Sequence, residues 1–106
     1  MGEAIPLHKK TTRGEDAVRE VEAMLRTMAC SIVDHPDEVV INAAVGHNNF
    51  VAFEVMCPEA DVGTMLGRRG SNADAMRYLL MAAAKARGLR VSMMIVSSEG
   101  EGSARR

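Results

Sequence analysis

Apolar side chains recur every three or four residues early in the chain, and this spacing predicts an amphipathic helix over residues 14 to 33. Pro36 ends the helix, because proline disfavours a helical conformation at the residue before it and lacks a backbone N–H. Two runs rich in apolar residues follow at 39–45 and 50–57, separated by Gly46-His47-Asn48-Asn49. The pattern predicts two antiparallel strands joined as a hairpin.

The second half of the chain repeats the helical pattern twice and then becomes extended. A short helix is predicted after Pro58, and a longer one begins after Gly70 and ends near Gly88. The run 90–96 alternates as a strand does. The resulting order is helix, strand, strand, helix, helix, strand, which is an α+β fold.

The sequence Gly67-Arg68-Arg69-Gly70 lies between the two later helices. Glycine has no Cβ, so both glycines can adopt positive φ and let another backbone approach closely. The first N–H groups of the next helix favour an anion, and arginine suits phosphate oxygens. The motif therefore predicts a clamp for a phosphate backbone. The alternative is a helix–turn–helix corner with a glycine cap and two solvated arginines.

Two separated segments carry a resemblance to a known family. Residues 62–70, followed by Ala73, Ala75, Met76 and Arg77, resemble the small bacterial KH proteins of the KhpA type, and so does the segment 32–39. The similarity covers about residues 15 to 96. It implies a type II KH domain, α-β-β-α-α-β, with a three-stranded mixed sheet packed against three helices. We assign this domain to residues 14–96, preceded by a flexible extension (1–13) and followed by a disordered Gly/Ser/Glu/Arg tail (97–106).

The resemblance implies a binding function for single-stranded RNA, as an RNA chaperone or post-transcriptional regulator. A KH loop clamps about four nucleotides, and single-stranded DNA stays an alternative ligand. The resemblance also implies partners: a second copy in a homodimer, a longer KH protein of the KhpB (Jag) type, or both. Ser71 and Asp74 stand where basic residues are common in the family, so the cationic surface beside the loop is thinner.

We predict two groups of RNA-binding residues. The phosphate site comprises Gly67, Arg68, Arg69, Gly70 and Ser71. The apolar groove for the bases comprises Val62, Leu66, Ala73, Met76, Val91, Met93 and Ile95. Arg77 either reaches the RNA or forms a surface ion pair with Asp74, which lies three residues earlier.

Charge and composition refine this picture. The net charge is -1, but residues 14 to 57 hold two Lys/Arg against eight Asp/Glu, whereas residues 58 to 96 hold six against three. The motif therefore lies in the basic half. Only three aromatic residues are present, which disfavours RNA modules that stack bases on sheet aromatics. The acidic first half leaves open a rival interpretation, a KH-fold protein-interaction module in which RNA binding is weak or lost.

The sequence contains no motif that indicates another function. Cys30 and Cys57 form no C-x-x-C motif, no metal-ligand spacing occurs, and the glycines do not match a nucleotide-binding loop. We therefore expect no enzyme activity, no cofactor, no metal and no small-molecule substrate. The absence of a secretory signal and of a membrane span predicts a cytoplasmic protein without a membrane partner.

Overall fold

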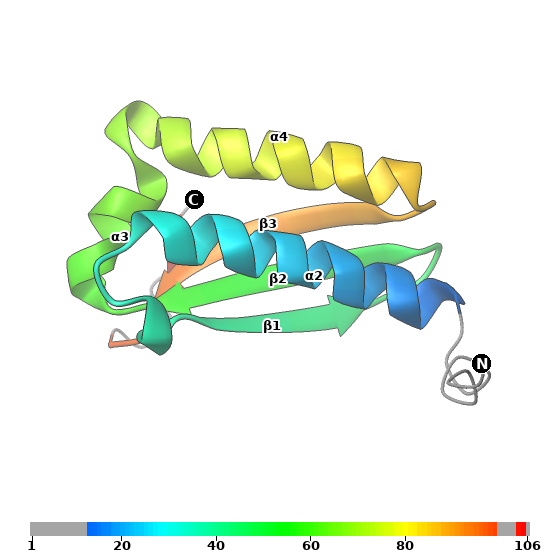
Figure 1. The fold of residues 1–106 in the computed structure, drawn as a ribbon, viewed down its shortest axis with the longest axis horizontal. Coiled ribbons are helices and arrows are strands. Elements are labelled where there is room, and N and C mark those ends of the chain that lie inside the picture. Colours follow the sequence, from blue (N-terminus) through cyan, green and yellow to red (C-terminus); the bar gives the residue numbers. More distant parts are fainter. Residues whose placement is uncertain (1–12, 100–103, 106) are drawn as a thin grey trace, which may run out of the picture.

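Three helices cover one face of a β-sheet, and the other face of the sheet is open (Figure 1). The computed structural model describes residues 13–99 and 104–105. The helical elements are α2 (Arg13–Ile32), η1 (Pro36–Glu38), α3 (Glu59–Leu66), η2 (Arg68–Gly70) and α4 (Ser71–Ala86). The strands are β1 (Val40–Val45), β2 (Phe50–Cys57), β3 (Arg90–Ser97) and β4 (Ala104–Arg105).

The sheet is mixed, with the strand order β1-β2-β3-β4. β1 and β2 pair antiparallel, from Val40 opposite Met56 to Val45 opposite Val51. β2 and β3 pair parallel, and a parallel neighbour requires a crossover connection, which α3, η2 and α4 supply. The predicted α-β-β-α-α-β order with a three-stranded mixed sheet is therefore confirmed.

A fourth, two-residue strand extends the sheet beyond the prediction. β4 pairs antiparallel with β3, with Ile95 opposite Arg105 and Val96 opposite Ala104. Ser97, which the sequence analysis assigned to the tail, completes β3 and is buried. The described structure differs here from the predicted disordered tail, because backbone N–H and C=O groups can join a sheet edge whatever their side chains are. Residues 1–12 of the predicted extension lie outside the described residues, and Arg13 already belongs to α2.

The hydrophobic core lies between the helices and the inner face of the sheet. Buried and partly exposed residues alternate along β2, as expected of a strand with one covered face. The largest fully buried apolar side chains come from every layer: Leu25, Phe53, Met65, Leu80 and Ile95. Burial of each stabilises the fold by about 1.5–3 kcal/mol. None of the helices in the described segments is long and apolar enough to cross a membrane.

Candidate nucleic-acid interface

The turn between α3 and α4 is held in a conformation that favours glycine. Gly67 has φ 77° and ψ 174°, and Gly70 has φ 78° and ψ 14°. A hydrogen bond from the Gly70 N–H to the Gly67 carbonyl, 3.0 Å long, closes the turn. The backbone of Arg69 is also left-handed, with φ 56° and ψ 27°, a conformation that is strained for a residue with a Cβ. Both glycines therefore have the positive φ that the sequence analysis expected of residues that shape this loop.

Close packing adds a second requirement for glycine at position 67. A Cβ built there would lie 2.6 Å from Asn72 Cγ and 2.7 Å from the Asn72 backbone nitrogen. Asn72 is held in place because its Nδ2 donates a 2.8 Å hydrogen bond to the Thr64 carbonyl near the end of α3. At Gly70, no atom lies within 4 Å of a built Cβ. Asn72 therefore joins the two helices across the turn, a role that the sequence analysis did not assign. The sequence does carry a signal for this role: Asn72 has an amide side chain and follows the end of a helix closely enough to reach its last carbonyls, which lack hydrogen-bond partners within the helix.

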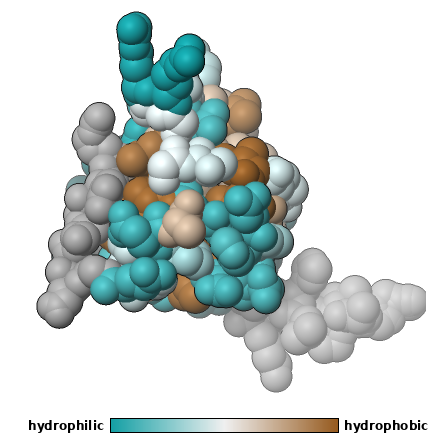
Figure 2. All heavy atoms as spheres, turned by 90° about the vertical axis from the view of Figure 1, so that its left-hand side faces the viewer, coloured by the Kyte–Doolittle hydropathy of each residue, from teal (hydrophilic) through white to brown (hydrophobic). Residues whose placement is uncertain are grey.

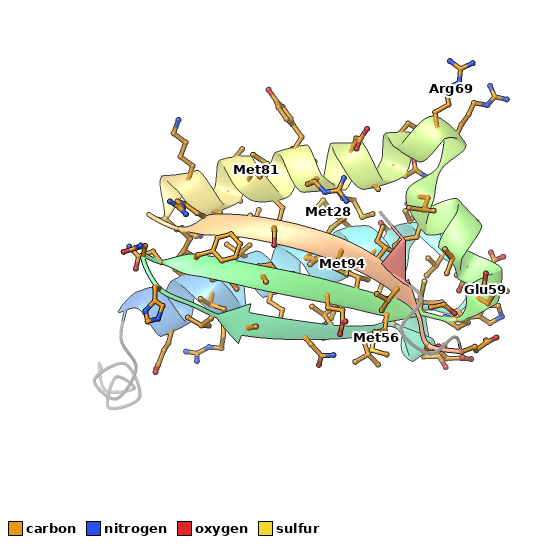
Figure 3. All side chains as sticks on the ribbon, turned by 180° about the vertical axis from the view of Figure 1, so that it is seen from behind. Met28, Met56, Glu59, Arg69, Met81 and Met94 are labelled. Carbon is orange, nitrogen blue, oxygen red and sulfur yellow. The ribbon has the colours of Figure 1, made fainter. Side chains whose placement is uncertain are left out.

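Arg68 and Arg69 present two positive charges to solvent at this corner. Both are exposed, and no described residue forms an ion pair with either of them. Figure 3 shows the Arg69 side chain projecting away from the body of the molecule. Figure 2 shows hydrophilic side chains protruding at the end of the molecule where α3 meets α4. Two flexible cations with unobstructed access are suited to an extended anion such as a phosphate backbone.

The first turn of α4 contributes to the same positive corner. Gly70 is its N-cap and makes no side-chain capping hydrogen bond, and Ser71 begins the helix in an exposed position. The first N–H groups of a 16-residue helix carry a partial positive charge that favours an anion. Asp74, in the first turn, offsets part of that charge. The phosphate-site residues of the sequence analysis, Gly67 to Ser71, are thus brought together on one exposed turn.

The predicted groove residues are distributed differently. Five of them belong to the buried core, each with at most 6% of its surface exposed: Val62, Ala73, Met76, Met93 and Ile95. In this conformation they are part of the core and offer almost no surface to a ligand. Leu66 and Val91 are half-buried and keep accessible apolar surface. Alternation alone could not distinguish these two groups, because it identifies an apolar face and not the elements that cover it.

Arg77 lies between α4 and β3. Its Nη1 is 3.1 Å from Asp74 Oδ1, which is the ion pair that the sequence analysis considered. Its Nη2 also donates a 3.3 Å hydrogen bond to the Met93 carbonyl. The Arg90 N–H donates to Asn49 in the hairpin turn, so by alternation the backbone groups of Met93 point away from β2. Arg77 therefore occupies the outer edge of β3 and is only partly accessible.

A buried carboxylate fixes the start of α3, at the other end of the helix that leads into the turn. Asp61 has no exposed surface and accepts hydrogen bonds from the backbone N–H groups of Asp34 and His35. His35 Nδ1 lies 3.0 Å from Asp61 Oδ2. Burial opposes ionisation of Asp61, but the His35 side chain and the two N–H donors outweigh it and lower the pKa of the carboxyl. The hydrogen bond to Asp61 and its charge raise the pKa of His35.

The remaining polar groups form no further site in the described segments. Cys30 and Cys57 are free thiols, and burial, followed by the charge of Asp61, raises the pKa of Cys57 to about 11. A thiol of this kind is unreactive at neutral pH. Within residues 13–99 and 104–105, no three His, Cys, Asp or Glu side chains are grouped in a way that could hold a metal ion.

Comparison with known proteins gives the same fold assignment as the geometry. The family model described as KhpA/KhpB, KH domain matches residues 22–95, which include both the Asp61–His35 link and the glycine-framed turn. No solved structure matches the chain at a significant level.

Similar proteins are named for RNA binding. The chain is 36% identical to the RNA-binding protein KhpA of Caldanaerobacter subterraneus subsp. tengcongensis over 73 residues, which are 69% of this chain and 96% of that protein. It is 34% identical to the RNA-binding protein KhpA of Clostridium acetobutylicum over 76 residues, 72% of this chain and 100% of that protein. It is 36% identical to the RNA-binding protein KhpA of Borreliella burgdorferi over 77 residues, 73% of this chain and 92% of that protein.

Proposed function

Because the chain belongs to the KhpA/KhpB KH-domain family, we propose that it binds single-stranded RNA and holds the phosphate backbone at the turn Gly67–Gly70. The observation that carries the proposal is the exposure of Arg68 and Arg69 on a strained turn at the start of α4. Glycine at 67 and 70 lets the strand approach, and the arginines and the α4 N–H groups bind its phosphates. The family members compared above are named RNA-binding proteins, which supports the same function.

The bases would lie beside the turn, where Leu66 keeps accessible apolar surface. A KH clamp of this kind contacts about four nucleotides, so one module binds weakly. We propose that two modules act together, either as a homodimer or with a longer KhpB-type KH protein, because linkage raises the effective concentration of the second site. This function needs no catalytic group and no cofactor. We propose that the protein acts in the cytoplasm as an RNA chaperone or post-transcriptional regulator.

The test of this function reverses the charge of the turn while keeping both glycines. The double variant Arg68→Asp/Arg69→Asp is titrated into a labelled pool of random 12-nucleotide RNAs and followed by fluorescence anisotropy. Affinity is expected to fall by at least about tenfold. The matched control is Lys85→Asp/Arg26→Asp, which changes the net charge equally on exposed residues outside the turn and should bind nearly as well as the parent chain.

Salt dependence provides a second readout. Each phosphate contact contributes about -0.7 to the slope of log affinity against log salt on a single strand, so loss of two contacts should reduce the slope by about 1.4. Equal affinity for the turn variant and its control would contradict the clamp. A parent chain with no measurable RNA or DNA binding would favour the rival function, a protein-interaction module, for which the acidic first half of the chain is the supporting observation.

A further inference from the structure

Two contacts cover the outer edge of β3, the edge that faces away from β2. The backbone groups of Met93 point toward this edge, and by alternation those of Ile95 do so too. The Met93 carbonyl accepts the hydrogen bond from Arg77 Nη2. Ile95 lies opposite Arg105 of β4, so these two residues form a hydrogen-bonded pair. β4 therefore occupies the part of the β3 edge that follows the Arg77 contact.

The residues directly after β3 are attached to the start of α3. The Ser98 N–H donates a 2.9 Å hydrogen bond to the Cys57 carbonyl at the end of β2. Glu99 Oε2 accepts a 3.3 Å hydrogen bond from the Glu59 N–H in the first turn of α3. The chain then meets β3 again at β4, which runs antiparallel to it. The described parts of the C-terminal segment are thus held at two places, beside α3 and on the β3 edge.

β4 is level with the turn Gly67–Gly70 along the length of β3. α4 and β3 run in opposite directions, and Arg77 marks where they meet because it reaches Met93. Gly70 precedes Arg77 by seven residues, which are about 10 Å of helix. Val96, opposite Ala104 of β4, follows Met93 by three residues, which are about 10 Å of strand. α4 lies over the β3 side of the sheet and β1 forms the opposite edge, so β4 occupies the edge that is nearer to the turn (Figure 1).

We propose that β4 is an autoinhibitory contact: it competes with RNA for the β3 edge beside the turn. This proposal rests on the proposed function and deepens it by assigning its regulation. In a strand held by its phosphates at the turn, the bases extend away from the arginines and toward this edge. An uncovered edge would offer them the N–H and C=O groups of Ile95 as hydrogen-bond partners. While β4 is paired, those groups are already bonded.

The contact is small enough for a ligand to displace it. β4 has two residues, and of their two pairs with β3 only the one between Ile95 and Arg105 is hydrogen-bonded. If RNA binds only while β4 is detached, the apparent affinity is reduced by the detached fraction. A detached fraction between about a tenth and a third would lower the affinity by about ten- to threefold.

Removal of residues 100–106 tests the competition, because it takes away β4 and keeps the contacts of Ser98 and Glu99. The removed segment holds two arginines and one glutamate, a net charge of +1, so electrostatics alone would weaken RNA binding. We expect the opposite result: the shortened chain should bind the random 12-nucleotide RNA pool about three- to tenfold more tightly in fluorescence anisotropy. Affinity equal to or below that of the parent chain overturns the proposal.

Two substitutions at one position separate the backbone contact from the charge. Arg105→Pro and Arg105→Ala both remove the guanidinium group, but only proline removes the backbone N–H that pairs with Ile95. Arg105→Pro should therefore bind RNA more tightly than Arg105→Ala. Equal affinity of the two variants would show that pairing of β4 does not limit RNA binding.

A disulfide that locks β4 in place gives the converse test. Val96 and Ala104 form the non-hydrogen-bonded pair, whose Cα atoms lie about 4.5 Å apart, within the range of a disulfide. The oxidised variant Val96→Cys/Ala104→Cys should bind RNA at least about tenfold more weakly than the same variant after reduction. The control Val96→Cys should bind equally in both states. If mass spectrometry finds no disulfide, or if the oxidised and reduced variants bind equally, the proposal is wrong.

The charge reversal at the turn separates failure of this proposal from failure of the proposed function. If removal of residues 100–106 leaves the affinity unchanged while Arg68→Asp/Arg69→Asp still lowers it, the clamp stands and only the inhibition by β4 is rejected. If neither the parent nor the shortened chain binds RNA, the proposed function fails and the inhibition with it. A shortened chain that binds RNA when the parent does not would be the strongest support for both.

Discussion

Alanine at position 67 should damage the protein far more than alanine at position 70, although both glycines have positive φ. Gly67 combines φ 77° with ψ 174°, a region that is essentially restricted to glycine and costs other residues about 1–3 kcal/mol. The new Cβ would also lie 2.7 Å from the Asn72 backbone nitrogen, and forcing atoms into occupied space costs about 1–3 kcal/mol more. Gly67→Ala should therefore lower the free energy of unfolding by about 2–6 kcal/mol.

Gly70 offers the matched comparison. Its backbone is in the left-handed helical region, and no atom lies within 4 Å of a built Cβ. Gly70→Ala should cost only about 1–2 kcal/mol, and Gly70→Asn still less, because asparagine tolerates this region. Urea denaturation followed by far-UV circular dichroism measures all three variants. Equal loss of stability for Gly67→Ala and Gly70→Ala, or a Gly67→Ala variant as stable as the parent, would refute the reasoning.

Three further substitutions test other contacts. Arg69→Gly should raise the free energy of unfolding by about 0.5–1 kcal/mol by relieving a left-handed arginine, while it weakens RNA binding; urea denaturation and RNA anisotropy check the two effects. Asn72→Ala removes the hydrogen bond to the Thr64 carbonyl and should cost about 0.5–1.5 kcal/mol in the same denaturation experiment. The pair formed by His35 and Asp61 should stabilise the fold most between pH 3.8 and 6.5, the ordinary pKa values of the two groups, since the pKa of His35 is raised and that of Asp61 is lowered. Its contribution is lost as pH rises through the pKa of His35, so the urea midpoint should fall toward pH 8 in the parent chain and change less in His35→Gln.

Most of the fold could be predicted from local patterns. The hairpin, the two helices around the turn and the last strand are each specified by periodicity and by glycine or proline at their ends, and their bounds agree with the structure within a few residues. β4 could not be predicted this way, because two residues of the Gly/Ser/Glu/Arg tail pair with β3 in a backbone ladder. Periodicity carries no information about such a contact.

The geometry of the turn Gly67–Gly70 could be predicted from the sequence, whereas the accessibility of the predicted groove residues could not. Glycine at 67 and 70 is required by backbone geometry, which acts within a few residues of sequence. The accessibility of the groove residues depends on which elements pack over them, and this is a property of the whole fold. Met76 and Met93 have the right periodicity for a binding surface but are buried between α4 and the sheet. Asp61 was missed because its partners are 26 and 27 residues earlier in the chain.

The turn Gly67–Gly70, where we propose that RNA binds, lies inside the crossover that makes β2 and β3 parallel neighbours, so the proposed binding segment also connects the two central strands of the sheet. The amide protons of α3 and α4 should therefore exchange with solvent largely through openings that also separate these two strands. A ligand held at the turn would slow deuterium uptake throughout the crossover and the central ladder, well beyond the residues it touches.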